Sequence, residues 1–326
     1  MKANTPKGVC IRGTPSERLI AVLTPQNTRM KFKELRRRTK LTSAELSAAI
    51  TAVRKVRSDL CFGKFDHCYW FANRPTWYSN QTDLSGIMPL KGAFGFVTDT
   101  HLCSIAERLD VMEEAYSTFA ALGITTVFHT GDLSDGWNEY RHHINFVKCH
   151  GDQAQAKYVI QHYPKRKGIT TYVIGGNHDD SYAASKIDRL SLVTHGFHYQ
   201  GEDIKGRDDI VYLGQYSHYI IMPQEVRLHM LHPRGGNAYA LSYKQQKRFE
   251  AMPRNERPDI QLSGHFHTYC HVCPDGVHMV AGAGVQDETE FFKRLGFMRS
   301  IGFQVCEYEI EKGLLKSFSP TCYSRE

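Results

Sequence analysis

The sequence of 326 residues contains no long hydrophobic run. Its most apolar stretches, such as residues 19–23, fall far short of the roughly 20 residues that a membrane-spanning helix needs. Near the N-terminus, Lys2 is not followed by the apolar segment of a secretory signal peptide. Internal repeats and low-complexity tracts are also missing. We therefore expect an intracellular, cytoplasmic protein with no membrane partner.

The sequence has no dense cysteine framework either. Its nine cysteines are scattered and odd in number, which favours reduced thiols over a disulfide scaffold. Cys270 and Cys273 have the spacing of half a zinc knuckle, but no second pair lies nearby. We interpret these two as ordinary thiols. A hydrophobic content of 41% and a charged content of 23% are typical of a globular protein with a sizeable core.

Positive charge is concentrated at one end of the sequence. Residues 1–80 contain 16 Lys and Arg against 5 Asp and Glu, a balance of +11. The remaining residues contain 25 against 29, a balance of −4. A basic segment joined to a mildly acidic one predicts a polyanionic partner for the first, and we expect nucleic acid. The composition makes no prediction of the oligomeric state.

Residues 1–75 are predicted to form a small basic module of three helices and a hairpin. Ser16 can cap a short helix that ends at Leu23, and a second helix covers about residues 31–38. Thr-Ser-Ala-Glu at residues 42–45 is a capping box that opens a third helix. Strand-like runs follow within residues 60–72. A helix-turn-helix followed by a hairpin resembles a winged-helix domain, although small three-helix modules also dock proteins.

Positive side chains on the second and third helices of this module are candidate nucleic-acid contacts. Lys and Arg contacts to phosphates give salt-dependent affinity irrespective of base sequence. The alternative is a solvated helix face. The predicted contacts are Lys33, Arg36, Arg37, Arg38, Arg54 and Lys55.

Residues 76–91 are rich in Ser, Asn, Gly and Pro and are predicted to be a linker. Beyond it, within residues 92–326, short apolar runs end repeatedly in residues that can bind metal ions. Continuous apolar strands predict sheets covered by helices, and hence an α/β fold. Helices are expected at about residues 104–122 and 152–163. Open α/β sheets place their sites just past the carboxyl ends of the strands, which is where these polar residues fall.

Five short motifs follow the apolar runs in order. Mixed imidazole and carboxylate ligands suit manganese, iron, zinc, cobalt or nickel better than magnesium or calcium. Two such ions about 3.5–4 Å apart can clamp a phosphodiester and activate a water molecule. The motifs are Asp99-Thr-His101, Gly131-Asp132-Leu-Ser-Asp135, Gly176-Asn177-His178-Asp179, His232-Pro and Gly264-His265-Phe-His267.

Over residues 92–275 these motifs resemble the calcineurin-like metallophosphoesterase superfamily. The resemblance implies a four-layer αββα sandwich, here preceded by the winged-helix-like module. It also implies two divalent metal ions, with Mn²⁺ as the first choice and Fe, Zn, Ni or Co as others. The implied metal ligands are Asp99, His101, Asp132, Asn177, His232, His265 and His267.

The resemblance also implies separate roles for these residues. Asp132 would bridge the two ions, His178 would act as the outer-shell acid, and Asp135 would pair with the His178 imidazole. Asp99, His101 and His267 would complete the ligands of one ion, and Asn177, His232 and His265 those of the other. The glycines at 131, 176 and 264 would let the backbone turn sharply beside the metals.

The predicted function is that of a metal-dependent phosphoester hydrolase. We expect a phosphodiesterase or nuclease that acts on DNA or RNA through a two-metal-activated hydroxide. A small-molecule phosphoesterase, for cyclic nucleotides or phosphomonoesters, is one alternative, and a DNA-binding regulator with little or no catalysis is another. A protein phosphatase is disfavoured, because Gly136-Trp137 stands where those enzymes have Arg-Gly, and Asp179 where they have Glu.

Other candidate residues receive plainer interpretations. His229 is a rival of His232, but it lies inside an apolar run and is expected to face the sheet. The pair at 142–143 is expected at the surface, although residues 137–167 join two metal-bearing loops and could rim the site. Lys293 and Arg294 could reach a substrate phosphate, but an ordinary exposed loop is the expected location. The tail from residue 316 onward supports no prediction.

Overall fold

The computed structural model describes residues 13–23, 30–56, 60–63, 67–71, 81–181, 189–236, 238–254, 256–296 and 299–325. The chain divides into two compact units. One comprises Met1–Ser79 with Met252–Arg257, and the other Asn80–Ala251 with Pro258–Glu326. The second unit therefore begins within the segment predicted as a linker.

The first unit contains the three helices and the hairpin that the sequence predicts. Its sheet has the order β1-β3-β2, and both pairings are antiparallel. The leucine-rich faces of the helices supply its core, in which Leu19, Leu35 and Leu46 are fully buried. The elements are α1 (Pro15–Leu23), β1 (Met30–Lys31), α2 (Phe32–Thr39), α3 (Ser43–Val56), β2 (Leu60–Gly63) and β3 (Cys68–Phe71).

Two capping boxes start helices of this unit. At α3, Thr42 N donates to Glu45 Oε2 at 2.8 Å and Glu45 N donates to Thr42 Oγ1 at 3.2 Å, as predicted. At α1 the expected cap is wrong. Thr14 and Glu17 make the same reciprocal pair, at 2.8 and 3.3 Å, because the helix starts at Pro15, one residue before Ser16. The winged-helix interpretation of the unit stays a prediction.

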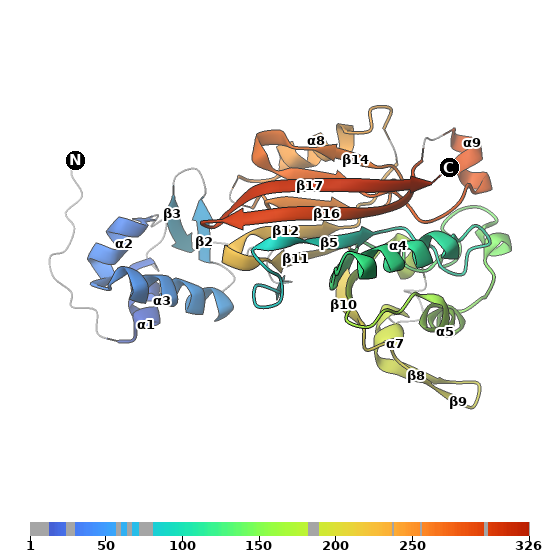
Figure 1. Ribbon diagram of the computed structural model, residues 1–326, viewed down its shortest axis with the longest axis horizontal. Coiled ribbons are helices and arrows are strands. Elements are labelled where there is room, and N and C mark those ends of the chain that lie inside the picture. The colour runs from blue at the N-terminus through green and yellow to red at the C-terminus, as the bar shows by residue number, and fades with distance from the viewer. Residues whose placement is uncertain are drawn as a thin grey trace. The chain divides into compact units, whose positions relative to one another are not determined.

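The second unit contains two six-stranded sheets (Figure 1). The first sheet has the order β10-β7-β6-β5-β16-β17, in which the first four strands are parallel and the last two antiparallel. Its strands are β5 (Lys91–Val97), β6 (Thr126–His129), β7 (Thr170–Gly175), β10 (Ile210–Gln215), β16 (Ile301–Glu311) and β17 (Leu314–Arg325). Within it, β17 is the tail for which the sequence supported no prediction.

The second sheet has the order β14-β15-β13-β12-β11-β4. Its strands are β4 (Gln81–Asp83), β11 (Ser217–Ile221), β12 (Arg227–Leu231), β13 (Ile260–Ser263), β14 (Cys270–Val272) and β15 (His278–Ala281). The edge strand β4 lies in the predicted linker and pairs in parallel with β11. A separate hairpin, β8 (Gly196–Tyr199) with β9 (Glu202–Lys205), extends from the unit (Figure 1).

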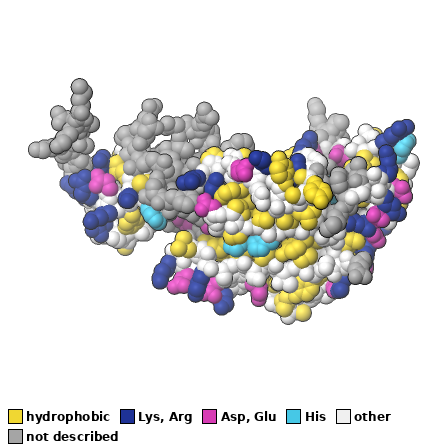
Figure 2. All heavy atoms as spheres, turned by 90° about the horizontal axis from the view of Figure 1, so that it is seen from above, with side chains coloured by type: hydrophobic (Ala, Val, Ile, Leu, Met, Phe, Trp, Pro, Cys, Tyr) yellow, Lys and Arg dark blue, Asp and Glu magenta, His cyan; other side chains and the backbone are white. Residues whose placement is uncertain are grey.

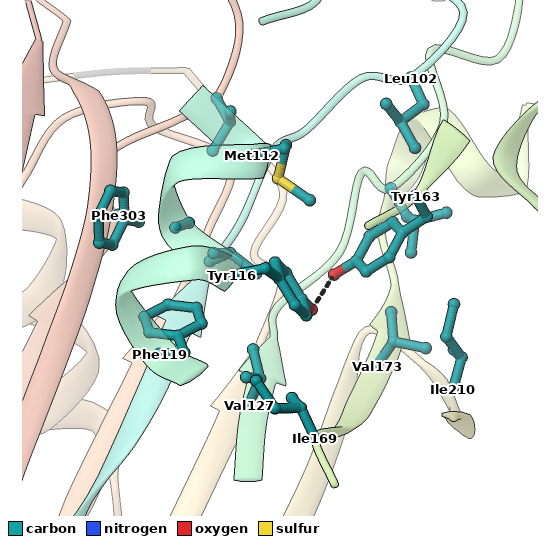
Figure 3. Close-up of a cluster of buried hydrophobic side chains, with 14 of the residues drawn as sticks. Leu102, Met112, Tyr116, Phe119, Val127, Tyr163, Ile169, Val173, Ile210 and Phe303 are labelled. Carbon is teal, nitrogen blue, oxygen red and sulfur yellow. Dashed lines mark hydrogen bonds between the residues drawn. The ribbon is translucent and has the colours of Figure 1, made fainter. Parts of the chain in front are cut away.

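Helices cover the outer faces of the two sheets, which gives the predicted four-layer αββα arrangement. α4 (Leu109–Ala121), α5 (Asp152–His162) and α7 (Arg189–His195) contribute to the core of the first sheet. α8 (Tyr243–Ala251) lies against the second sheet, where Gln245 Nε2 donates to Ser263 Oγ of β13 at 2.7 Å. Two shorter helices, α6 (Asn177–Asp180) and α9 (Glu290–Leu295), lie near the ends of the strands. α4 packs on the first sheet, where Phe119 lies edge-on to Phe303 at 5.5 Å. Figure 3 shows this helix–sheet core, including the hydrogen bond of 2.9 Å between the Tyr116 and Tyr163 hydroxyls.

A second core fills the space between the sheets. Side chains alternate along β5, so Phe94 and Phe96 point toward the second sheet while Val97 packs on the helix side. Leu228 and Leu262 meet them from β12 and β13. This double burial explains the continuous apolar runs that precede the motifs.

In the face seen in Figure 2, acidic and basic side chains lie beside one another where charged residues appear, and a broad area between them shows hydrophobic side chains and histidine. No helix in the described part of the chain has the length and apolar character that crossing a bilayer requires.

Candidate metal centre

The structure brings all seven predicted metal ligands together. Each follows a strand: Asp99 comes after β5, Asp132 after β6, Asn177 after β7, His232 after β12 and His265 after β13. The parallel strands of each sheet place their carboxyl ends at one edge. The two edges meet, since His265 N, after β13, donates to Asp99 Oδ1, after β5, at 2.9 Å. His101 and His267 complete the set. The spacing of ligands in the sequence is therefore a consequence of strand order.

Five of these residues have the left-handed backbone conformation that residues other than glycine rarely adopt. The φ angles are 50° at Asp99, 44° at His101, 53° at Asp132, 79° at His265 and 50° at His267. Such conformations cost of order 1–3 kcal/mol each and cluster at functional sites, where the surrounding structure holds them. Their concentration here supports a functional site.

Close approach explains the glycine at two of the motif turns. Gly131 has a φ of +98°, and a Cβ there would lie 2.5 Å from His232 Nδ1. Gly176 has an ordinary φ, but its Cβ would lie 2.2 Å from Asp132 Oδ1. A larger residue at either position would displace a candidate ligand.

One group of ligand atoms consists of Asp99, His101 and His267, whose donor atoms all lie within 4.8 Å of one another. His101 Nε2 and His267 Nε2 are 3.1 Å apart, and His267 Nε2 lies 3.6 Å from Asp99 Oδ1. All three side chains are buried. Burial raises the pKa of Asp99 to about 6. A cation at this position would remove the cost of burying that carboxylate.

A second group contains Asp132, His232 and His265, again within 4.8 Å. Asn177 belongs with them, because its Oδ1 lies 3.1 Å from His232 Nε2 and 3.0 Å from His265 Nδ1. Asn177 Nδ2 donates to Glu139 Oε2 at 3.0 Å, which turns the amide oxygen toward the imidazoles. Asn177 and His265 are only half-buried, so this group is the open side of the site.

In three imidazoles an outer partner fixes which nitrogen faces the cluster. His232 Nδ1 donates to the Thr130 carbonyl at 2.7 Å, and His265 Nε2 donates to the Gly235 carbonyl at 2.8 Å. His101 Nδ1 pairs with Asp135 Oδ1 at 3.0 Å. A carbonyl or carboxylate can only accept, so in the neutral form of each ring the other nitrogen carries the lone pair that a metal needs.

The spacing of these donor atoms fits bound metal ions. With metal–ligand bonds of about 2.1 Å, neighbouring ligand atoms in tetrahedral or octahedral coordination lie roughly 3.0–3.4 Å apart. The contacts of His101 with His267 (3.1 Å), His232 with Asp132 (3.2 Å) and Asn177 with His265 (3.0 Å) fall in this range. Two imidazole nitrogens facing each other at this distance are better explained by a shared cation than by a hydrogen bond alone.

Asp132 lies between the two groups. Its Oδ2 is 3.2 Å from His232 Nε2 and 3.9 Å from His101 Nε2. Burial alone would raise the pKa of Asp132, but the nearby imidazoles of His232 and His178 lower it well below its usual range. Burial alone would lower the pKa of His232. The negative charge of Asp132 outweighs this effect and raises the pKa of His232 to about 9.

Asp135 reaches His178 differently from the prediction. The His178 Nδ1 donates to the Asp135 carbonyl at 2.6 Å, whereas the Asp135 carboxylate lies 3.7 Å away from it. That carboxylate instead bonds His101 Nδ1 through Oδ1 and His143 Nε2 through Oδ2, at 3.0 and 3.1 Å. The reason is that Asp135 lies deep between two imidazoles, so only its backbone faces His178.

The surface assignment of His143 is wrong. The ring is buried, because the 137–151 segment folds back over the site and carries it inward. Nothing in the sequence indicates that His143 lies next to Asp135, because the two adjacent histidines belong to no motif. The expectation that this segment rims the site agrees with the structure, since Glu139 also contacts Asn177.

Two buried charged residues brace the metal loops. The Asp179 carboxylate accepts from Leu133 N at 3.1 Å, from Ser134 N at 3.0 Å and from Gly176 N at 3.0 Å. Arg189 donates to the Asp179 carbonyl at 3.0 Å and to Ser134. Arg189 belongs to no motif, so sequence reasoning missed it. Asp179 could have been found, because it is the last residue of the motif that begins at Gly176.

Arg234 is an exposed cation beside the open side. It follows His232 by two residues, and its guanidinium lies 4.9 Å from the centroid of the Tyr216 ring and 3.3 Å from Asp180 Oδ2. Asp180 belongs to α6, the helix that carries His178. The Arg234 side chain remains 68% exposed.

A disulfide joins Cys103 and Cys149, contrary to the expected reduced thiols at these positions. The two residues are 46 positions apart, and nothing in their spacing indicates the pairing. The bond ties the 137–151 segment to the loop that follows His101. Cys270 and Cys273 have free thiols, as expected.

The other sequence-predicted residues are not among the candidate metal ligands. His229 is buried inside β12 and stacks on Tyr219 at 4.3 Å, so the preference for His232 agrees with the structure. Lys293 and Arg294 lie in the helix α9 rather than in a loop.

The predicted nucleic-acid contacts on α2 are exposed. Arg37 and Arg38 both pair with Glu34, each at 2.7 Å. Arg36 donates to Ser43 Oγ at 3.2 Å. Exposed pairs of this kind are weak enough for a phosphate to compete with. The full set on α2 is Lys33, Arg36, Arg37 and Arg38, while the side chains of Arg54 and Lys55 lie outside the described residues.

A family model described as calcineurin-like phosphoesterase matches residues 92–269. The chain therefore belongs to the calcineurin-like phosphoesterase family, and membership is consistent with metal-dependent hydrolysis of phosphoesters. The match ends two residues after His267, so it covers every predicted ligand.

Solved structures with a similar fold include a predicted phosphoesterase from Streptococcus pneumoniae, with 14% identity, a TM-score of 0.33 and coverage of 73% of this chain and 99% of that one. An archaeal phosphodiesterase has 13% identity, a TM-score of 0.36 and coverage of 71% and 99%. Vps29 with zinc from Entamoeba histolytica has 13% identity and a TM-score of 0.32, and the match covers 71% of this chain and 98% of that one. At these TM-scores the likenesses carry no argument about function. No curated protein matches the chain.

Proposed function

We propose that this protein hydrolyses phosphodiester bonds of nucleic acid with the help of two divalent metal ions. The observation that carries the proposal is the place of Asp132, between one group of ligand atoms around His101 and another around His232. A carboxylate shared in this way suits a pair of ions better than a single one. Asp99, His101 and His267 would hold one ion, and Asn177, His232 and His265 the other.

Bound ions would neutralise phosphate charge and activate water near neutral pH. The protein's own contribution is to hold the ligands and to move a proton. Because His178 Nδ1 donates its proton to the Asp135 carbonyl, Nε2 is the nitrogen that can donate a proton to a leaving oxygen. The His178 side chain is 14% exposed, which fits a group that touches substrate.

A nucleic-acid substrate is supported by charge. The first 80 residues have a balance of +11, and the exposed Lys33 and Arg36 lie on one of its helices. Such a unit adds salt-dependent affinity for a polyanion. Arg234 supplies a further cation next to the open side of the metal centre.

The test is hydrolysis by metal-stripped protein to which Mn²⁺ is added back. Substrates are bis-p-nitrophenyl phosphate, p-nitrophenyl phosphate, and labelled single- and double-stranded DNA and RNA. Asp132→Asn removes the shared carboxylate at nearly constant volume. Asp110→Asn is the matched control, because Asp110 is 67% exposed on α4 and pairs with Arg108.

We expect cleavage of the diester and of nucleic acid by wild type and by Asp110→Asn, and at least about a hundredfold loss in Asp132→Asn. Turnover of the phosphomonoester alone would refute the phosphodiester assignment. Diester cleavage without nucleic-acid cleavage would refute the substrate class and leave a small-molecule phosphoesterase. Undiminished activity in Asp132→Asn would refute the site.

A further inference from the structure

Two aromatic side chains from distant segments stack on each other beside the metal centre. The ring centroids of Phe291, in α9, and Tyr140 are 5.1 Å apart with an interplanar angle of 25°. Phe291 is 40% exposed and Tyr140 is half-buried. We call this pair the aromatic shelf. The exposed part of the Phe291 ring is accessible to a ligand.

Ring contacts connect the shelf to both sides of the site. On one side Phe292 lies 5.9 Å from Phe291 and 4.8 Å from His267. The Phe291 ring is thus two ring contacts from a predicted metal ligand.

On the other side Tyr140 stacks on His143 at 4.3 Å and 26°, and His143 lies 5.3 Å from His178. His178 is the proposed proton donor at the scissile bond. Because His143 and Phe291 stack on opposite faces of Tyr140, the ring face left for a ligand is that of Phe291.

The main chain holds the shelf in a fixed place. Val285 N donates to the Asp99 carbonyl at 3.0 Å, so the segment leading to α9 is tied to a metal loop. Thr289 then caps the helix by accepting from Phe292 N at 3.3 Å. A binding surface fixed in this way loses little entropy when a ligand docks.

We propose that the aromatic shelf stacks on the nucleobase next to the scissile phosphodiester. This inference rests on the proposed function, and it makes Phe291 a residue that selects nucleotides over other phosphodiesters. Stacking on aromatic rings is tolerant of base identity, because every base presents a π-face. Lys293 and Arg294 are exposed on the same short helix, so positive charge for a neighbouring phosphate lies close by.

The experiment compares two substrates with the same leaving group, thymidine 5′-p-nitrophenyl phosphate and methyl p-nitrophenyl phosphate. The readout is the ratio of their kcat/KM values with Mn²⁺-loaded full-length protein. Phe291→Ala removes the ring, and Phe291→Trp keeps a stacking surface. Tyr323→Ala is the matched control, because Tyr323 is similarly exposed at 37% and stacks on Phe303 at 5.0 Å.

We expect Phe291→Ala to lower the ratio roughly tenfold through a higher KM for the thymidine ester. Phe291→Trp and Tyr323→Ala should leave it within about twofold. An equal loss on both esters in Phe291→Ala would overturn the shelf while leaving the phosphodiesterase function intact. Absence of turnover of either ester by wild type would overturn both proposals together.

Discussion

Replacing Asp135 by Asn should weaken metal binding without unfolding the protein. The carboxylate accepts from His101 Nδ1 at 3.0 Å and from His143 Nε2 at 3.1 Å. An Asn of nearly the same shape has one acceptor oxygen, so its amide nitrogen must face the donor of the other imidazole. One charge-assisted hydrogen bond is lost, which is worth about 1.5–3 kcal/mol.

When Asn turns its amide nitrogen toward His101, the ring is no longer held with Nε2 facing the site. Outer carboxylates of this kind typically contribute 10- to 100-fold in metal affinity. We therefore expect Asp135→Asn to raise the apparent Kd for Mn²⁺ by about 10- to 100-fold. The measurement is competition with a fluorescent chelator, with thermal unfolding of the metal-free protein as a check on folding.

Asp203→Asn is the matched control. Asp203 also pairs with a histidine Nδ1, that of His198 at 2.7 Å, but it is 93% exposed on the β8–β9 hairpin. This variant should bind Mn²⁺ like wild type. Wild-type affinity in Asp135→Asn would refute the role assigned to its carboxylate.

Three further predictions concern protons, phosphate and the cross-link. Burial alone would lower the pKa of His232, but Asp132 raises it to about 9, so below that pH a metal must displace a proton. Metal affinity should therefore rise from pH 7 to 9, with proton release seen by calorimetry in buffers of different ionisation enthalpy; a flat profile would contradict this. Arg234→Ala should raise KM for DNA and reduce the slope of log KM against log salt by about one, whereas an unchanged slope would exclude a phosphate contact. Cys149→Ser should lower the free energy of unfolding by about 2–4 kcal/mol, because it opens the link to Cys103; an unchanged denaturation midpoint would show that the bond does not stabilise the fold.

Much of the fold could be predicted because the core strands are buried on both faces. Such strands are continuous apolar runs, and each motif begins where a run ends, as at Val97 before Asp99. β17 was not predicted because it is an edge strand whose side chains are mostly exposed. Its sequence therefore has neither a continuous apolar run nor an alternation of apolar and polar residues. β4 escaped for a similar reason, since only three residues of a polar segment pair with β11.

The candidate ligands could be located by motif, but the residues that orient them could not. His143 and Arg189 reach the site only because the chain folds back over it, and both look ordinary in the sequence. The Cys103–Cys149 pair is equally invisible, because cysteine spacing does not fix connectivity. The roles of the ligands and the nucleic-acid contacts stay predictions.

The most direct test of the central claim is a titration of metal-stripped protein with Mn²⁺ at protein concentrations far above the Kd. The rate of single-stranded DNA hydrolysis is measured against the number of equivalents bound. Two ions sharing Asp132 predict little activity through the first equivalent and a rise that ends at the second. Full activity at one equivalent, or none at two, would contradict the two-metal phosphodiesterase.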